Sequence, residues 1–81
     1  MASSIFYPKS SIKIDMQISI NGEQTTVDND LNLAKLVEMQ ELQGKRIAIE
    51  VNEELVSRTH FESHLLKEGD QVEIVQAIGG G

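Results

Sequence analysis

The chain has 81 residues, enough for one small domain, and it contains no cysteine. The lack of cysteine excludes disulfides, thiolate metal sites and a cysteine nucleophile, and it agrees with a reducing compartment. Thirteen acidic against seven basic residues give a net charge of −6, which argues against a nucleic-acid partner and suits a basic docking surface on a partner protein. No apolar run approaches the roughly 20 residues of a membrane-spanning helix, so we expect a cytoplasmic protein.

The first 15 residues differ in composition from the rest and hold the only proline and the only tyrosine. One interpretation is a disordered or non-native extension, either vector-derived or created by a misassigned start. The other is that the first strand begins early, because the apolar alternation of 16–20 already includes Ile12 and Ile14. We expect an N-terminal extension at 1–15, a folded domain at 16–76 and a flexible C-terminal tail at 77–81.

The first predicted elements form a β-hairpin. Residues 16–20 alternate apolar and polar side chains, as a half-buried strand does. Asn21-Gly22 follows, and both residues tolerate the positive φ angles of a two-residue hairpin turn. Residues 23–27 then predict the returning strand.

A single main helix is predicted next. Asn32 suits the N-cap, because its side-chain oxygen can accept an early helical N–H. An apolar stripe then faces a sheet, and Gly44 suits the C′ position of a helix of about ten residues. The stripe comprises Leu33, Leu36, Val37 and Gln40.

The second half of the chain predicts three more strands. Residues 46–51 and 54–56 flank a tight turn at Asn52-Glu53, and 71–75 form the last strand after a turn at 68–70. Val72 and Ile74 of this strand point inward and Val75 outward. The segment 57–66 between them is irregular or short-helical, with Phe61, Leu65 and Leu66 as its anchors in the core.

This order of elements predicts an α+β fold in which a mixed sheet of four to five strands packs on one main helix. The first and last strands are expected to be parallel neighbours at the centre of the sheet.

Three residue groups suggest chemistry only weakly. His60 and His64 form His-x-Glu-x-His rather than the metalloprotease His-Glu-x-x-His, and no third ligand is evident, so no metal site is predicted. The acidic residues in turns are expected to be solvated and at most to steer a basic partner; they are Glu53, Glu54, Glu68 and Asp70. Lys45, Arg46 and Arg58 are expected to pair with nearby acids.

The chain ends in three glycines, Gly79-Gly80-Gly81. A glycine tail stabilises nothing by itself, because it has no side chains to pack and loses much entropy when ordered. It is either a frayed end or cloning remnant, or a probe that brings the carboxylate of Gly81 through a narrow channel of a partner. The glycines alone leave both interpretations open.

Four stretches of this chain together resemble the ThiS sulfur carrier family of thiamine biosynthesis, which has the ubiquitin-like β-grasp fold. The resemblance covers 16–81, although Val56-Ser57-Arg58 stands where the family often has Val-Pro-Arg. The four stretches are Asn21-Gly22, Ile-Ala-Ile-Glu-Val-Asn at 47–52, Glu-Gly-Asp-Gln-Val-Glu at 68–73, and Gln-Ala-Ile-Gly-Gly-Gly at 76–81.

The resemblance implies a protein co-substrate rather than an enzyme. A ThiF-like adenylyltransferase would use ATP to adenylate the carboxylate of Gly81. A persulfide sulfur, supplied by a cysteine desulfurase or another persulfide protein, would displace AMP and leave a thiocarboxylate. A ThiG-like thiazole synthase would then take the sulfur for the thiazole ring. The carrier would bind no cofactor, because it has no phosphate-binding loop and ATP would be bound by the partner.

The residues themselves also indicate which positions meet the partners. Val75 faces outward, and with Ala77 and Ile78 it forms an apolar patch that would dock, unless the N-terminal extension or a loop covers Val75. Gly79 and Gly80 allow close backbone contact and would line the partner's channel. Residues 76–81 reach roughly 20 Å when extended. The alternatives are the small subunit of molybdopterin synthase, a ubiquitin-like protein modifier, and an interaction module with incidental glycines.

Overall fold

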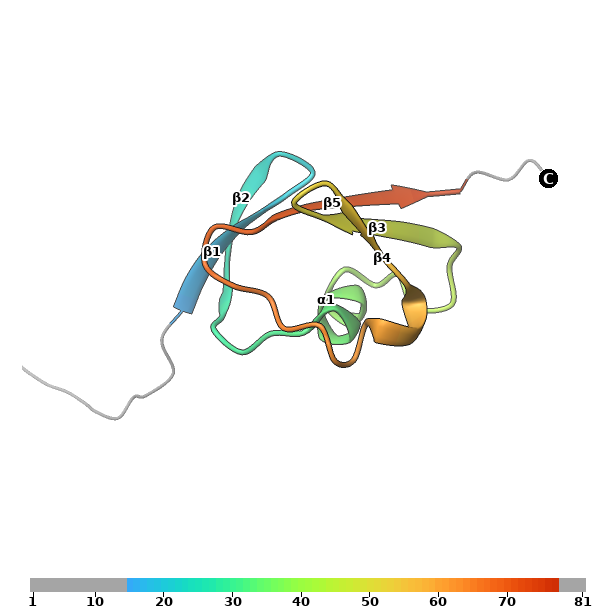
Figure 1. The fold of residues 1–81 in the computed structure, drawn as a ribbon, viewed down its shortest axis with the longest axis horizontal. Coiled ribbons are helices and arrows are strands. Elements are labelled where there is room, and N and C mark those ends of the chain that lie inside the picture. Colours follow the sequence, from blue (N-terminus) through green and yellow to red (C-terminus); the bar gives the residue numbers. More distant parts are fainter. Residues whose placement is uncertain (1–14, 78–81) are drawn as a thin grey trace, which may run out of the picture.

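The computed structural model describes residues 15–77, which form one five-stranded sheet covered on one face by a single α-helix (Figure 1). The strand order is β2-β1-β5-β3-β4, so the last strand lies at the centre of the sheet. In chain order the elements are β1 (Asp15–Ile20), β2 (Glu23–Asp28), α1 (Leu33–Met39), β3 (Ile47–Val51), β4 (Glu54–Val56), the 3-10 helix η2 (Arg58–His60) and β5 (Gln71–Gln76).

Two hairpins build the two sides of the sheet. β1 and β2 are antiparallel around Asn21-Gly22, and β3 and β4 are antiparallel around Asn52-Glu53. All four turn residues have positive φ angles between 52° and 85°, as a two-residue turn matched to the strand twist requires. Both predicted turns are therefore confirmed. β1 includes Asp15, one residue before the predicted start of the domain.

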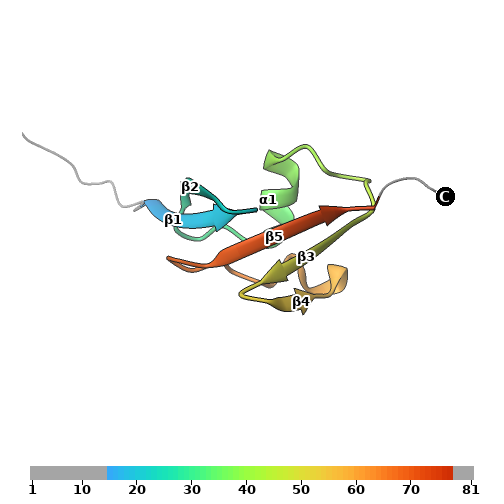
Figure 2. The ribbon, with the colours of Figure 1, turned by 90° about the horizontal axis from the view of Figure 1, so that it is seen from above.

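β5 joins the two hairpins into one sheet (Figure 2). It pairs in parallel with β1 through Ser19–Gln71 and Ile20–Val72, as expected, and it pairs antiparallel with β3 from Val72 to Gln76. The contact with β1 is short, so the second half of β5 is paired on the β3 side only. β5 is thus the strand with which both hairpins pair.

The first turn of the helix is capped by side-chain and backbone acceptors. The Asn32 side-chain oxygen accepts the backbone N–H of Lys35 at 2.7 Å, which confirms the predicted N-cap. The backbone carbonyl of Asn32 accepts the N–H of Leu36. The N–H groups of Leu33 and Ala34 donate to carbonyls of the segment between η2 and β5. The first three residues of the helix, whose N–H groups have no partner within it, therefore all donate to acceptors outside it.

The helix is shorter than predicted and does not end at Gly44. It spans seven residues, and Glu41 rather than glycine adopts the left-handed conformation, with φ 60°. The N–H of Leu42 donates to the carbonyl of Val37, and the N–H of Glu41 to that of Glu38, which is the Schellman pattern. Gln40 is exposed at the C-cap, outside the buried stripe.

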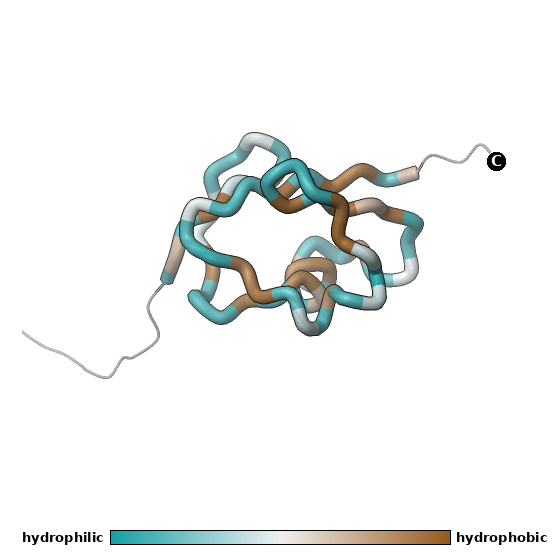
Figure 3. Tube along the Cα trace, viewed as in Figure 1, coloured by the Kyte–Doolittle hydropathy of each residue, from teal (hydrophilic) through white to brown (hydrophobic). Residues whose placement is uncertain are grey.

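The core lies between the helix and one face of the sheet. Figure 3 shows hydrophobic residues in the strands and in the helix beneath them, and hydrophilic residues in the turns. Burial follows the predicted alternation, and the inward side chains of β1 and β3 are buried except for Ile47, which is only partly buried at the start of β3. The core residues are Met16, Ile18, Ile20, Val27, Leu31, Leu33, Leu36, Val37, Ile49, Val51, Phe61, Leu66 and Val72.

The segment between η2 and β5 contradicts two predictions. Leu65 is 58% exposed and is no core anchor, because its backbone bridges to Asn32 and turns its side chain outward. Asp70 is buried at 8% exposure, so it is not a solvated turn charge. Its carboxylate accepts hydrogen bonds from the side chain of Asn52 at 3.0 Å and from the N–H of Lys67 at 2.8 Å. Within residues 15–77 no helix is long and apolar enough to cross a membrane.

Candidate functional site

The chain leaves the sheet at the end of β5. The N–H of Ala77 donates to the carbonyl of Arg46 at 2.9 Å, one residue after the last strand residue, Gln76. Figure 1 shows β5 running out past the helix to this end of the domain. Four residues separate Ala77 from the carboxylate of Gly81, and four extended residues span about 13 Å. The base of the tail is therefore held at a defined place, on the residue that precedes β3.

A shallow hollow of about 270 Å³ lies beside this anchor point. Apolar side chains from β3 and β5 form one part of its wall, and two arginines form the rest. The register places Ala48 of β3 directly opposite Val75 of β5. The lining residues are Arg46, Ile47, Ala48, Arg58, Val75 and Ala77.

The two arginines of the hollow form no ion pairs with acids among the residues that the structure describes, contrary to the prediction. Arg58 donates from Nη2 to the carbonyl of Lys45 at 3.2 Å, and its guanidinium lies 5.9 Å from the centre of the Phe61 ring. Across residues 15–77 the single ion pair joins Lys35 and Glu38, at 3.4 Å. Sequence reasoning missed both arginines as part of the site, because they come together only when β3 and η2 pack side by side.

Of the residues predicted to meet partners, the structure describes two. Val75 is 62% exposed on the outer face of the sheet, as the strand alternation predicted, and Ala77 is exposed beside it. Ile78, Gly79, Gly80 and Gly81 lie outside the described residues. The described geometry therefore concerns the base of the tail.

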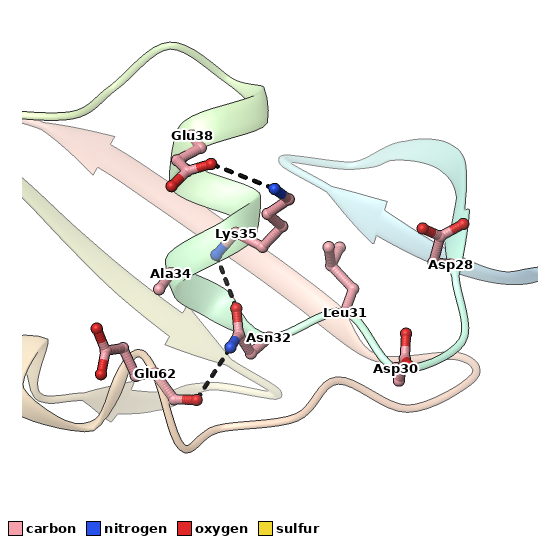
Figure 4. A pocket seen from close by; sticks show the side chains of 8 residues that line it. All are labelled: Asp28, Asp30, Leu31, Asn32, Ala34, Lys35, Glu38 and Glu62. Atoms are coloured by element: carbon pink, nitrogen blue, oxygen red, sulfur yellow. Dashed lines mark hydrogen bonds and ion pairs between the residues drawn. The ribbon is translucent and has the colours of Figure 1, made fainter.

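A larger hollow of about 510 Å³ lies at the N-terminal end of the helix, far along the chain from the tail (Figure 4). Its polar groups already serve the helix cap, since the Asn32 amide also donates to the carbonyl of Glu62. Lys35 forms an ion pair with Glu38. The remaining wall carries Asp28 and Asp30 without a nucleophile or base beside them, so this hollow offers no reaction chemistry.

His60 and His64 line a third hollow, of about 330 Å³, together with Leu55. The His64 N–H donates to the His60 carbonyl, so this spacing forms a turn after η2 rather than one face of a longer helix. Throughout the described part of the chain no three His, Cys, Asp or Glu side chains come together to hold a metal ion.

Comparisons with known proteins agree with this architecture. A sulfur carrier protein ThiS from Escherichia coli is 27% identical over 66 residues, which cover 82% of this chain and all of that protein. A thiazole synthase from Magnetococcus marinus is 35% identical over 66 residues, and these cover 82% of this chain but only 20% of that protein. The crystal structure of the thiamine biosynthesis protein ThiS from Geobacter metallireducens superposes with a TM-score of 0.70 at 33% identity, covering 82% of this chain and all of that one.

The structural match confirms the predicted ubiquitin-like β-grasp fold, a mixed five-stranded sheet on one helix. The model of the ThiS family matches residues 17–81, which is most of the chain and includes the three final glycines. The predicted family resemblance is therefore confirmed, and the chain belongs to the ThiS family.

Proposed function

We propose that this protein is a sulfur carrier for thiamine biosynthesis, and that Gly81 carries the sulfur as a C-terminal thiocarboxylate. The observation that carries the proposal is the anchoring of Ala77 on Arg46, just before β3, with only Ile78 and the three glycines following in the sequence. A compact body with a short glycine end suits delivery of a carboxylate into another protein's active site. Membership of the ThiS family supports the same function.

In this proposal the carrier is a co-substrate and its partners perform the chemistry. An adenylyltransferase resembling ThiF binds ATP and transfers AMP to the Gly81 carboxylate, with release of pyrophosphate. A persulfide sulfur then attacks the acyl carbon and expels AMP, and reductive cleavage of the remaining S–S bond by a thiol leaves the thiocarboxylate. The carrier's own contribution is to position the acyl carbon.

The proposed recipient of the sulfur is a thiazole synthase. A protein named thiazole synthase contains a segment similar to 66 residues of this chain, so a carrier-like sequence and the rest of that protein occur in one polypeptide. Such an arrangement favours a partnership between this carrier and a ThiG-like synthase. The synthase would take the sulfur from the thiocarboxylate.

The direct test is the intact mass of the full chain after incubation with a ThiF-like adenylyltransferase, ATP, a cysteine desulfurase and cysteine. We expect a gain of about 16 Da, because one carboxylate oxygen is replaced by sulfur. The matched variant is Gly80→Val, which should keep the fold but lose the gain, since a branched side chain blocks close backbone contact in a channel. An unchanged mass of the parent chain contradicts the proposal.

Genetic complementation separates the pathways. The gene should restore growth to a bacterium that needs thiazole because it lacks its own carrier, and should not restore molybdenum-cofactor synthesis in a strain lacking the molybdopterin synthase small subunit. Attachment of the chain to lysines of other proteins would point to a protein modifier instead. Restored molybdenum-cofactor synthesis or attachment to lysines would each contradict a role in thiazole formation.

A further inference from the structure

Two glutamates face each other on the outer surface of the sheet, close to the tail. The antiparallel register of β3 and β5 places Glu50 directly opposite Glu73, and both side chains are exposed. Like charges directly opposite each other on neighbouring strands destabilise a sheet. Among residues 15–77 neither glutamate forms an ion pair that would relieve the repulsion.

The next row along the same two strands is apolar. It pairs Ala48 with Val75, two residues further toward the tail and about 7 Å from the glutamates. Val75 is 62% exposed, which is unusual for a large apolar side chain at the centre of a sheet. One row further, the hollow at the base of the tail adds Arg46 and Arg58.

From the two glutamates to the base of the tail the surface therefore has three bands in order: acidic, apolar and basic. The basic band lies at the margin of the sheet, because Arg58 also lies over the ring of the buried Phe61. The basic band is notable because the whole chain is acidic, with a net charge of −6. Any protein that holds Gly81 in its active site must come within about 13 Å of Ala77, because four residues span no more than that. Such a protein comes close to the end of the sheet from which the tail leaves, and the banded face borders that end.

We propose that the banded face is the docking surface for the adenylyltransferase that activates Gly81. The partner presents an apolar side chain to Ala48 and Val75, a cationic side chain to Glu50 and Glu73, and an anionic group to Arg46 and Arg58. This inference rests on the proposed function and adds which surface of the carrier the enzyme binds. The cationic side chain of the partner neutralises the repulsion between Glu50 and Glu73, which destabilises the free carrier. The glutamate pair therefore favours docking and lowers stability.

The test is the initial rate of adenylation against carrier concentration, measured by pyrophosphate release with the full chain. In Glu73→Gln we expect KM to rise roughly 2- to 5-fold at unchanged kcat, because one docking charge is lost while the tail is intact. The same variant should melt roughly 1 to 4 °C higher, because the repulsion is removed. Improved stability with weaker docking is a combination that mere misfolding does not produce.

The matched control is Asp30→Asn, which removes one exposed negative charge beside the start of the helix, in a hollow that none of the docking residues lines. It should leave KM and melting temperature unchanged. Arg46→Gln tests the basic band and should also raise KM roughly 2- to 5-fold. Added salt should raise the parent's KM and narrow its difference from both docking variants.

The outcomes separate this inference from the proposed function. If Glu73→Gln and Arg46→Gln keep the parent's KM while all chains are adenylated, the docking surface is wrong and the carrier function stands. If the parent chain is not adenylated at all, both fail. If sedimentation shows a dimer of the parent that these two substitutions dissociate, the face binds a second copy, and the adenylyltransferase is not its occupant.

Discussion

Asp70 shows how a single side chain links distant parts of this small domain. Its carboxylate accepts hydrogen bonds from Asn52 in the β3–β4 turn and from Lys67 in the approach to β5. The Asn52 side-chain oxygen in turn accepts the N–H of Gln71 at 2.9 Å. One buried acid therefore joins the turn of one hairpin to the start of the central strand.

Replacing this acid should cost stability. In Asp70→Ala the Asn52 amide and the Lys67 N–H lose their acceptor, and we expect the free energy of unfolding to fall by about 1–3 kcal/mol. Urea denaturation followed by circular dichroism measures the loss. Glu62→Ala removes an exposed acid and should change stability by less than about 0.5 kcal/mol. Equal stability of the two variants would show that the Asp70 network contributes nothing.

At the level of elements, the two hairpins differ in one turn residue. Asn21-Gly22 has the preferred composition, whereas Asn52-Glu53 places a glutamate at φ 72°. A residue with a Cβ pays a steric penalty in this left-handed region, and glycine does not. The β3–β4 hairpin therefore folds against a local strain that the β1–β2 hairpin avoids.

Glu53→Gly should relieve this strain and stabilise the domain by about 1 kcal/mol. The converse change, Gly22→Ala, should destabilise it by a similar amount, about 1 kcal/mol. An added Cβ at Gly22 meets no atom within 4 Å, so its effect comes from the φ angle of 85° alone. Thermal denaturation of both variants checks the pair, and a loss of stability in Glu53→Gly would contradict the argument.

At the level of the whole molecule, the two faces of the sheet have separate tasks. The inner face packs on the helix and holds the core, whereas the outer face is exposed and carries the banded surface beside the tail. Ile49 is fully buried and Val75, on the neighbouring strand, is 62% exposed. Because alternate residues face opposite sides, a substitution on the outer face leaves the packing of the core unchanged.

Truncation on each face should show this separation. Ile49→Ala should cost about 2–5 kcal/mol, a large share of the roughly 4–12 kcal/mol that an 81-residue domain has. Val75→Ala should cost less than about 0.5 kcal/mol, because the side chain is already in water. Guanidinium titrations measure both values. A loss above about 1 kcal/mol for Val75→Ala would place that side chain in the core rather than on a free face.

Features set by short-range rules were predictable from the sequence. Asn32 caps the helix, both turns begin with asparagine at positive φ, and Val75 points outward, all as predicted. The helix end was predicted wrongly: Gly44 does have a positive φ angle, but the left-handed residue that ends the helix is Glu41. A glycine is only favoured at that position, and the Schellman hydrogen bonds allow a residue with a Cβ to take its place.

The sequence by itself therefore determined the strands, the helix start, the turns and the glycine end, since each depends on neighbours a few residues away. Only the tertiary structure decided that Glu50 faces Glu73, that Arg46 and Arg58 border the base of the tail, and that Asp70 is buried. These placements depend on the pairing of β5 with β3, whose residues lie more than twenty positions apart. Local propensity carries no information about which distant strand completes a sheet, because packing of the whole core selects it.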